Sequence, residues 1–483
     1  MSGVPSVLII GAGAAGVAAA TRLLENGIDN IKILEAENRI GGRIYSLEFD
    51  GVFIDLGGQW VHGEKGNIVY EMVKDLGLLH TSFNNYEDNT FYMSNGENVN
   101  KNITDRLFQI GLSIIEDSEC AIQHPGPYGN YFIKIYKEKV SEEFKDDASA
   151  LELAACVQDW FHKFCICLDS AKSWYEISTL GAACRFEYCE GDQQLNWGER
   201  GFKTILDVLM KKIPDASKQL HLDDKILLKK VVKKIQWGDS EQTVTCEDGS
   251  VFTADHVIIT CSVGVLKTTY RSLFDPALPS YKVNSIEHIS MGTVNKILLR
   301  FPRKWWPEDT KGFSLLWTDE DRKNLVNEIP SLGPVDEDGR SWLEDVFGFY
   351  VIDNHPRILL GWVVGKMAAE VEHCTDEDVT QGCMALLRKF VGNKYDIPTP
   401  DAILRSSWNS NPHFCGSYVY SSIEQDEYNA SSEDLARPIV SEKSKKPVLL
   451  FAGEATSTNH YSTVNGAIET GYREADRLIE FYK

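Results

Sequence analysis

Three glycines and one acid near the N-terminus have a spacing that can do chemistry. Gly11, Gly13 and Gly16 follow the apolar run SVLII and open the helix-favouring run AGVAAATRLLENG. In a strand–turn–helix unit such glycines allow a tight turn, close approach of a pyrophosphate and close helix packing. Glu35 ends the next apolar run, IKILEA, where an acid can bind ribose hydroxyls. The pattern predicts a dinucleotide site with its phosphates at the helix start.

Motifs outside this unit favour a flavin over a nicotinamide. Arg43 closes EAENRIGGR directly after the ribose acid, and GGQW ends at Trp60. A nicotinamide site needs neither motif, whereas FAD has more pyrophosphate and ribityl chain to hold. Near the C-terminus, FAGEATSTNHYSTVNGAIETG places Glu454 before a helix expected to begin near Val464. The N-terminus of that helix can stabilise negative charge on a reduced flavin ring.

A lysine interrupts an apolar strand in the second half of the chain. Alternation between Val294 and Phe301 places Lys296 on the same face as Val294 and Leu298. From the strand alone, the simpler interpretation is an edge strand with a solvated or snorkelling ammonium. A buried ammonium is costly unless it is paired or hydrogen-bonded, so a buried Lys296 requires specific partners.

Other patterns outline the elements that must position these groups. Residues 104–173 are mostly helical, and residues 225–260 are strands with turns at Gly238-Asp239 and Asp248-Gly249. The run TDEDVTQGCMALLRKFVG is an amphipathic helix with Thr375 as its cap. Residues 448–456 contain a buried strand that precedes a final helix.

The composition is that of a soluble globular enzyme. The 483 residues are 43% hydrophobic and 25% charged, and the length predicts two or three domains. A net charge of −22 argues against nucleic acid as a partner and favours small cations, although acidity for solubility explains the charge more simply.

The cysteines and the chain ends bear on location. Eleven scattered cysteines lack CxxC spacing, and MSGVPSVLIIGAG is a strand and not a secretion signal, so we expect a reducing, cytoplasmic setting. No apolar run approaches 18 residues and RLIEFYK is not a peroxisomal address, so no membrane span or peroxisomal targeting is expected. Neither a metal site nor a protein partner is evident.

These segments, together with VVKKI, VIITCSVGVLK and MGTVNK, resemble the FAD-dependent amine oxidase family and, within it, the polyamine oxidases. The resemblance covers nearly the whole chain, more loosely between residues 100 and 200. It implies an α/β fold in which a discontinuous Rossmann-type FAD-binding domain is interleaved with an α+β substrate-binding domain. The expected FAD-binding segments are residues 1–95, 196–280 and 438–483, and the substrate-binding segments are residues 96–195 (helical) and 281–437 (sheet and helix).

The resemblance also implies which residues meet the cofactor. Val232 would hold the adenine through its backbone, and Glu454 and Val464 would hold other parts of FAD. The full expected FAD-binding set is Gly11, Gly13, Ala15, Gly16, Glu35, Arg43, Gly58, Gln59, Trp60, Val232, Trp408, Glu454, Thr463 and Val464.

Two residues receive catalytic roles from the resemblance. In this family the lysine of the MGTVNK strand points at the flavin and holds a water against its reactive nitrogen. Lys296 is therefore expected to position water and to assist reoxidation by dioxygen. His62, in QWVHGEKGN, is expected to contact the substrate amine as a neutral imidazole, and a solvated loop histidine is the alternative.

The oxidation of an amine calls for an apolar channel, because the amine must lose its proton before the adjacent C–H can leave as hydride. An alkylammonium has a pKa of about 10.4, so deprotonation near pH 7.4 costs roughly 4 kcal/mol, which desolvation lowers. Candidate walls are Trp60, Trp408, Tyr418 and Tyr420. Each could equally belong to the core, which is the favoured place for Tyr420.

The remaining ammonium groups of a cationic substrate should meet acids. Glu187 and Glu190, in RFEYCEGDQQ with Asp192, are the candidates, although a solvated loop is equally consistent with this run. Tyr418 and Thr463 complete the expected substrate-binding set.

The sequence differs from the monoamine oxidases in two features, and these differences narrow the predicted subfamily. Those enzymes place two tyrosines about the flavin, and the aligned residues are Tyr418 and Thr463. They also tether the flavin through a cysteine, and the aligned residue is Ser417, with Cys415 two positions before it. FAD is therefore predicted to bind noncovalently.

The sequence thus predicts a polyamine oxidase. It would oxidise the carbon beside a secondary amine of spermine, spermidine or an acetylated polyamine and pass electrons to dioxygen, giving an aldehyde, an amine and hydrogen peroxide. The alternatives are an L-amino-acid or other amine oxidase of the same fold, and a non-catalytic FAD-binding interaction protein.

Overall fold

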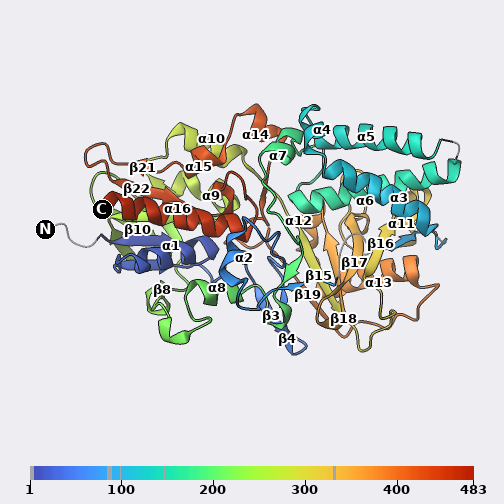
Figure 1. The fold of residues 1–483 in the computed structure, drawn as a ribbon, viewed down its shortest axis with the longest axis horizontal. Helices are drawn as coiled ribbons and strands as arrows, with labels where there is room; N and C mark the ends of the chain where they lie inside the picture. The colour runs from blue at the N-terminus through green and yellow to red at the C-terminus, as the bar shows by residue number, and fades with distance from the viewer. Residues whose placement is uncertain (1–4, 84–89, 98, 146, 330–332) are drawn as a thin grey trace.

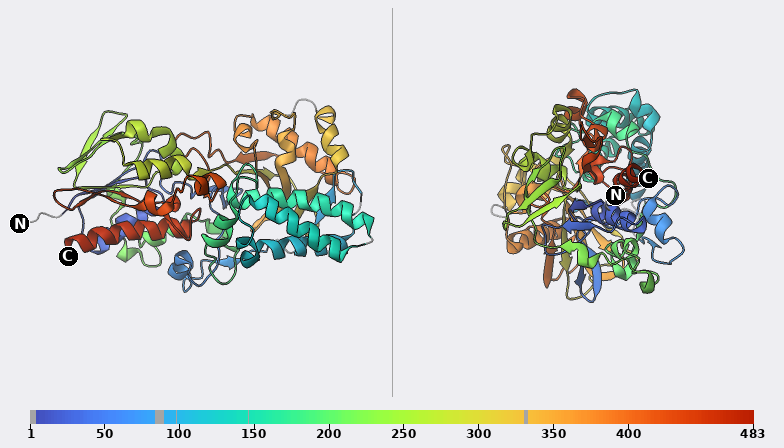
Figure 2. Two further views of the ribbon diagram at one scale, coloured as in Figure 1. Left: turned by 90° about the horizontal axis from the view of Figure 1, so that it is seen from above. Right: turned by 90° about the vertical axis from the view of Figure 1, so that its left-hand side faces the viewer.

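The computed structural model describes residues 5–83, 90–97, 99–145, 147–329 and 333–483. The molecule is elongated, and the start of the first strand lies at the same end as the C-terminus, on the left of Figure 1. One six-stranded sheet occupies this half and a second occupies the other half. Figure 2 shows the two halves from above, with the cyan and orange elements gathered in the second.

The first sheet has the strand order β21-β22-β12-β1-β2-β8, and its pairs are parallel except for β21–β22. All four residues of β1 are buried, as expected for a parallel strand covered on both faces. The strands are β1 (Val7–Ile10), β2 (Ile31–Leu34), β8 (Ile226–Leu227), β12 (His256–Ile259), β21 (Ile439–Val440) and β22 (Pro447–Phe451).

Helices from the two ends of the chain pack together on this sheet. Figure 1 shows α1 (Ala14–Glu25) beside α16 (Val464–Tyr482). The approach depends on Gly471, because a Cβ there would lie 2.3 Å from the carbonyl oxygen of Ala15. The predicted N-terminal strand–helix unit and the C-terminal strand and helix are confirmed, and both belong to one layer structure.

A four-stranded sheet with the order β11-β10-β9-β13 accompanies the first sheet. Its hairpins turn at the two predicted positions, after Gln236 and after Cys246. The strands are β9 (Val232–Gln236), β10 (Gln242–Cys246), β11 (Val251–Ala254) and β13 (Phe274–Asp275), and the nearby helices are α8 (Thr204–Leu209), α9 (Val263–Leu273) and α10 (Ser280–His288).

The second six-stranded sheet carries Lys296. Its order is β19-β15-β18-β17-β16-β6, and its pairs are antiparallel except for β6–β16. Because β15 pairs with β18 on one side and β19 on the other, the edge-strand interpretation of Lys296 is wrong. The strands are β6 (Phe91–Met93), β15 (Asn295–Arg300), β16 (Gly312–Leu316), β17 (Val346–Ile352), β18 (His355–Val363) and β19 (Ala402–Arg405).

Helices cover the second sheet on both sides. The predicted helical region between residues 104 and 173 is confirmed, and Trp160 in this region donates from its indole nitrogen to the Phe347 carbonyl on β17. Thr375 caps α13 (Asp376–Val391), as predicted. The other helices here are α3 (Lys101–Ile115), α4 (Ser118–Ile122), α5 (Tyr128–Glu143), α6 (Ala148–Asp169), α7 (Thr179–Cys184), α11 (Asp319–Glu328) and α12 (Ala368–Val371).

Short elements complete the described chain. They are α2 (Ile68–Val73), α14 (Ile423–Glu427), α15 (Ser432–Ala436), β3 (Ser46–Phe49), β4 (Val52–Asp55), β5 (His80–Thr81), β7 (Leu195–Asn196), β14 (Ser290–Met291) and β20 (Val419–Tyr420). None of the helices in the described ranges is both long enough and apolar enough to cross a bilayer.

Helix α10 packs against α9 and α15 in the first half, although the last substrate-binding segment was expected to begin at residue 281. Two further expected segment boundaries differ from the structure. Strand β6 belongs to the second sheet, although the first FAD-binding segment was expected to extend to residue 95. Helix α15 packs against α10 and β22 in the first half, although the last substrate-binding segment was expected to extend to residue 437. In both places the strand or helix belongs to the half that contains its hydrogen-bonding or packing partners, and those partners lie far away in the sequence.

Candidate functional site

A cavity of about 1570 Å³ is lined by residues from both halves of the molecule. At one end it reaches the turn between β1 and α1, and at the other it reaches α3, α5 and α6. Its lining includes Gly11 and Glu35 from the first half and Lys296 and Trp362 from the second. A single elongated cavity therefore connects the predicted nucleotide site with the predicted catalytic lysine.

The glycine turn has the geometry that the motif predicts. Gly11 adopts φ +103°, in the region that favours glycine, and a Cβ at Gly16 would lie 2.0 Å from the carbonyl oxygen of Gly11. Gly13 pairs with Gly41 through an isolated parallel bridge, and both line the cavity with Gly11. Gly16 does not line it and acts only by letting α1 pack against the turn, which corrects its expected place among the residues that contact FAD.

The ribose acid is held in place by the backbone. Glu35 is 6% exposed, and its two carboxylate oxygens accept the N–H groups of Ala12 at 2.6 Å and Glu37 at 2.8 Å. Burial raises the pKa of this carboxyl despite those two hydrogen bonds. Each oxygen keeps a further lone pair, so the group can still accept hydroxyl donors from the cavity.

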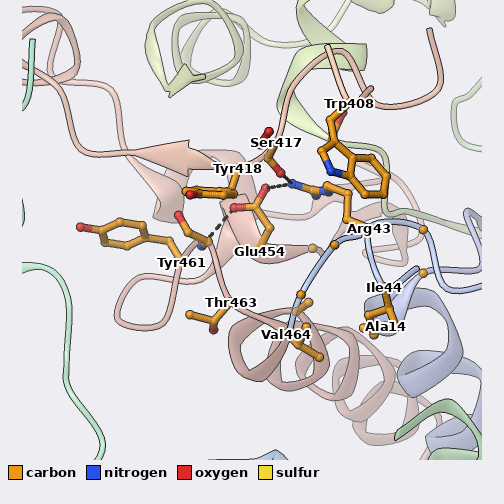
Figure 3. A pocket seen from close by; sticks show the side chains of 18 of the residues that line it. Ala14, Arg43, Ile44, Trp408, Ser417, Tyr418, Glu454, Tyr461, Thr463 and Val464 are labelled. Atoms are coloured by element: carbon orange, nitrogen blue, oxygen red, sulfur yellow. Dashed lines mark hydrogen bonds and ion pairs between the residues drawn. The ribbon is translucent and has the colours of Figure 1, made fainter. Parts of the chain in front are cut away.

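An ion pair joins the two ends of the chain beside the cavity. Arg43 donates from one guanidinium nitrogen to the Glu454 carboxylate at 2.8 Å and to the Ser417 carbonyl at 2.9 Å (Figure 3). The other oxygen of Glu454 accepts the N–H of Ser462 at 3.1 Å. Glu454 is 5% exposed, so Arg43 supplies the positive charge that a buried carboxylate requires.

The start of α16 faces the same region. The Thr463 hydroxyl oxygen accepts the N–H of Gly466 at 2.9 Å and caps the helix. Thr463, Val464 and Asn465 line the cavity, so the positive end of a 19-residue helix points toward it. The helix start predicted near Val464 is confirmed.

Lys296 is buried and fully hydrogen-bonded. Its side chain borders the cavity, the residue is 5% exposed, and its ammonium donates to the carbonyl oxygens of Asp55 and Gly57 and to the side-chain oxygen of Gln59, each at 2.8 Å. These acceptors differ from the expected water and flavin partners. They come from the end of β4 and from the GGQW run that follows it.

The surroundings of Lys296 lower its proton affinity. Burial brings its pKa down to about 8, while the nearby Asp55 carboxylate acts in the opposite direction. Burial also raises the pKa of Asp55 to about 6, although Ser46 and the N–H of Phe202 donate to its carboxylate. Lys296 therefore keeps its charge at neutral pH and approaches its titration range in mildly alkaline solution.

His62 is set up as a neutral acceptor. His62 is an exposed residue that borders the cavity, and desolvation by nearby protein lowers its pKa. Its Nδ1 lies 2.7 Å from the carbonyl oxygen of Gln193, which can only accept, so Nδ1 carries the proton. The neutral ring therefore has its lone pair on Nε2.

Aromatic side chains form the walls around Lys296. Its ammonium lies 6.0 Å from the ring centre of Trp60 and 5.2 Å from that of Trp362, and these rings lie 6.2 Å apart. Trp408 and Tyr418 also line the cavity, as predicted. Tyr420 lies in the core and donates to Glu176, in agreement with its expected place.

The predicted acidic group is only partly at the cavity. Glu187 and Asp192 line it, whereas Glu190 does not and forms an exposed ion pair with Lys65. The short turn between Cys189 and Gln193 directs the Glu190 side chain toward Lys65 on the neighbouring loop, so its expected substrate role is not supported.

The remaining predicted residues lie where the motifs placed them. Ala15, Gly58, Gln59 and Val232 all line the cavity. Sequence reasoning missed Trp362, which pairs with Lys296 across β15 and β18, because register between strands this far apart is not visible locally.

It also missed Asp169 at the end of α6. The available signal was an acid in the last position of a helix, where the helix dipole disfavours it.

The fold and this cavity define a flavoenzyme of the amine-oxidising class. A family model described as flavin containing amine oxidoreductase matches residues 14–479. The chain belongs to this family, and the family binds FAD.

Named relatives cover essentially the whole chain. The peroxisomal N(1)-acetyl-spermine/spermidine oxidases of Bos taurus and Homo sapiens are each 30% identical to it, over 99% of this chain and 95% and 96% of theirs. Polyamine oxidase 1 of Zea mays is 27% identical over 98% of this chain and 90% of its own. A structure of putrescine oxidase bound to putrescine has a TM-score of 0.69 at 20% identity, with 99% of each chain covered, and shows the same fold.

The residues present fit FAD. The cavity is long, the glycine turn and the start of α16 both open into it, and Glu35 offers free acceptor capacity.

Proposed function

We propose that the chain is an FAD-dependent polyamine oxidase that uses dioxygen. Its substrate is a small cationic amine such as spermine, spermidine or an acetylated polyamine. FAD, when bound, accepts the hydride from the carbon beside a secondary amine and returns the electrons to dioxygen as hydrogen peroxide. The imine that forms is hydrolysed to an aldehyde and a shorter amine.

One observation carries the proposal: a buried lysine and a neutral histidine border the same aromatic cavity in a chain that binds FAD. A binding scaffold requires neither group. The lysine costs free energy to bury, and the chain satisfies all three of its ammonium protons beside the cavity.

The role assigned to His62 is to contact the substrate amine and to accept its proton. Deprotonating an alkylammonium near neutral pH costs roughly 4 kcal/mol, so a neutral acceptor at the cavity wall assists the step. The lone pair on Nε2 provides that acceptor, and the hydrogen bond from Nδ1 to Gln193 fixes the ring orientation. Trp60, Trp362 and Tyr418 exclude water around the amine and favour its uncharged form.

Lys296 is assigned two effects. Its hydrogen bonds hold Gly57 and Gln59 at the cavity floor, and its positive charge in an apolar setting favours negative charge that develops when dioxygen is reduced. The predicted contact through a water requires the ammonium to exchange one of its three protein acceptors for that water.

The rival oxidase is less well supported. An amino-acid oxidase needs a cationic side chain free to meet a carboxylate. Among the described arginines and lysines that line the cavity, Arg43 is engaged with Glu454 and the Ser417 carbonyl, and Lys296 with its three acceptors. The other two lie away from Lys296, beside Val232 at the expected adenine end: Lys230, which pairs with Asp248, and Lys233.

The deciding experiment is a peroxide assay with the purified holoenzyme across spermine, spermidine, their acetylated forms, simple monoamines and L-amino acids. Oxidation of the polyamines above the monoamines supports the proposal. Peroxide from L-amino acids alone would replace it with the rival oxidase. A flavin that no amine bleaches under anaerobic conditions would leave the scaffold interpretation.

A reducing, cytoplasmic setting is part of the proposal. The cysteines within the described ranges are free thiols, consistent with a compartment in which disulfides do not form. The test is to isolate the protein from intact cells without reductant and to titrate its free thiols. Fewer free thiols than cysteines would contradict a reducing setting.

A further inference from the structure

Asp169 is a cavity acid without a partner. It lies at the last position of α6 and lines the cavity. No residue within the described ranges donates a hydrogen bond to its carboxylate or pairs with it, and burial alone raises its pKa to about 7. Asp169 is partly buried at the cavity wall, and a desolvated carboxylate is normally paired or hydrogen-bonded, so this one is free to accept a partner from the cavity.

Its place in the helix adds to the unfavourable electrostatics. The 22 residues of α6 end at Asp169, where the helix carries partial negative charge and its last carbonyl groups have no intrahelical partner. The Tyr418 hydroxyl donates to one of these, the carbonyl of Cys167. A second negative charge at this end is disfavoured in the free protein, whereas a cation would be attracted by the carboxylate and the helix end together.

Three tyrosines that border the cavity feel the charge of Asp169. Burial raises the pKa of Tyr128, Tyr188 and Tyr461, and the negative charge of Asp169 raises each further, which places the carboxylate within electrostatic reach of all three. All three border the cavity, and Figure 3 shows Tyr461 on the same side of Glu454 as Tyr418. Aromatic rings beside a carboxylate are the surroundings in which an alkylammonium binds.

The other acids of this cavity are solvated or engaged. Glu187 is exposed and accepts from the Asn459 amide at 3.0 Å, and Asp192 accepts the N–H of Gln194 at 2.8 Å. Glu116, at the end of α3, is exposed to water. Of these four acids, Asp169 combines a desolvated position with a carboxylate that no described residue engages.

We propose that Asp169 binds a second cationic nitrogen of the substrate, so that the cavity selects amines with a positive charge remote from the nitrogen being oxidised. This inference rests on the proposed amine oxidation and specifies its substrate class. Diamines and polyamines with a free distal ammonium are preferred over simple monoamines and over amines acetylated at that distal nitrogen.

The test compares Asp169→Asn with Glu116→Gln, which removes an exposed charge from the same cavity. With spermine, Asp169→Asn lowers kcat/KM at least tenfold, while its kcat/KM for a secondary monoalkylamine stays unchanged. Glu116→Gln leaves both within about twofold of the wild type, since exposed charges are screened. Asp169→Glu, which keeps the charge, recovers most of the spermine activity.

Binding gives a readout that needs no turnover. Calorimetric titration of the anaerobically reduced holoenzyme with spermine is expected to show a Kd at least tenfold higher for Asp169→Asn. Because the substitution removes an unpaired desolvated charge, its thermal midpoint should equal or exceed that of the wild type. A large fall in the midpoint, or failure to fold, would mark Asp169 as a structural acid and overturn the inference.

The outcomes distinguish failure of this inference from failure of the proposed function on which it rests. If the wild type oxidises no amine, the proposed function fails whatever Asp169 does. If the wild type oxidises spermine and Asp169→Asn changes neither kcat/KM nor Kd for it, the function stands and the assignment of Asp169 is overturned.

Discussion

The ammonium of Lys296 and the main-chain carbonyl of Asp55 lie 2.8 Å apart, although 241 residues separate them in the chain. This hydrogen bond ties the interior strand β15 to the end of β4. The same ammonium binds Gly57 and Gln59, so one side chain fixes the loop that forms the cavity floor. Lys296 therefore stabilises this loop in addition to the chemical role proposed for it, and a test of that role must separate the two effects.

Lys296→Met is expected to retain FAD but to slow reoxidation of the reduced flavin by dioxygen on the order of a hundredfold, because a buried positive charge is lost. The substitution also leaves two carbonyl groups without their donor and should cost about 2–5 kcal/mol of stability. Stopped-flow absorbance measures the first effect and thermal unfolding the second.

Lys282→Met is the matched control. Lys282 is also buried, and its ammonium donates to the carbonyl groups of Asp434, Leu435 and Arg437, but it does not line the cavity. We expect a comparable loss of stability with unchanged reoxidation. Equal slowing in both variants would show that the effect of Lys296 is structural.

His62→Gln should lower kcat/KM for spermine by about 10²-fold, since general acid–base groups typically contribute 10²–10⁴. The active form of His62 is neutral, and desolvation holds its pKa below the usual 6.5. Activity is therefore lost only as the pH falls through that lowered value, which puts the acidic limb of the wild-type profile below about pH 6.5. A pH profile of kcat/KM checks this, because the limb should disappear in the variant. If the acidic limb persists unchanged in the variant, it belongs to a titrating group other than His62.

Arg43→Leu is expected to destabilise the protein more than Glu454→Gln. The first substitution leaves a carboxylate that is 5% exposed without its counter-charge, at a cost of about 3 kcal/mol, whereas the second keeps a neutral acceptor for Arg43 and for the N–H of Ser462. Thermal midpoints of the FAD-free proteins measure the difference. The reverse order would mean that Glu454 does not depend on Arg43 for its charge.

Motifs that act through their own backbone could be predicted from the sequence. The turn at Gly11, the cap at Thr375 and the start of α16 near Val464 each depend on residues within a few positions, and all three are as expected. The flavin-binding end of the cavity is built largely from such local units, which is why its residues could be named in advance.

Contacts between distant segments could not be predicted in this way. Nothing near Lys296 indicates that its acceptors are carbonyl groups more than 230 residues away. Glu190 and Asp169 show the same limit, because each is an acid within two residues of a cysteine in the sequence. Only the fold turns the first toward Lys65 in solvent and the second toward the cavity.

Noncovalent attachment of FAD is the last prediction. The hydroxyl of Ser417, at the aligned tether position, is buried, accepts the N–H of Val294 at 2.9 Å and donates to the carbonyl of the same residue at 3.1 Å, so it braces the backbone. Precipitation with acid should leave the yellow colour in the supernatant. A yellow pellet would point to Cys415 or Cys261, the cysteines nearest in the chain to this site that line the cavity. Cys415→Ser and Cys261→Ser would then show which thiol holds the flavin, because removing the tether returns the colour to the supernatant.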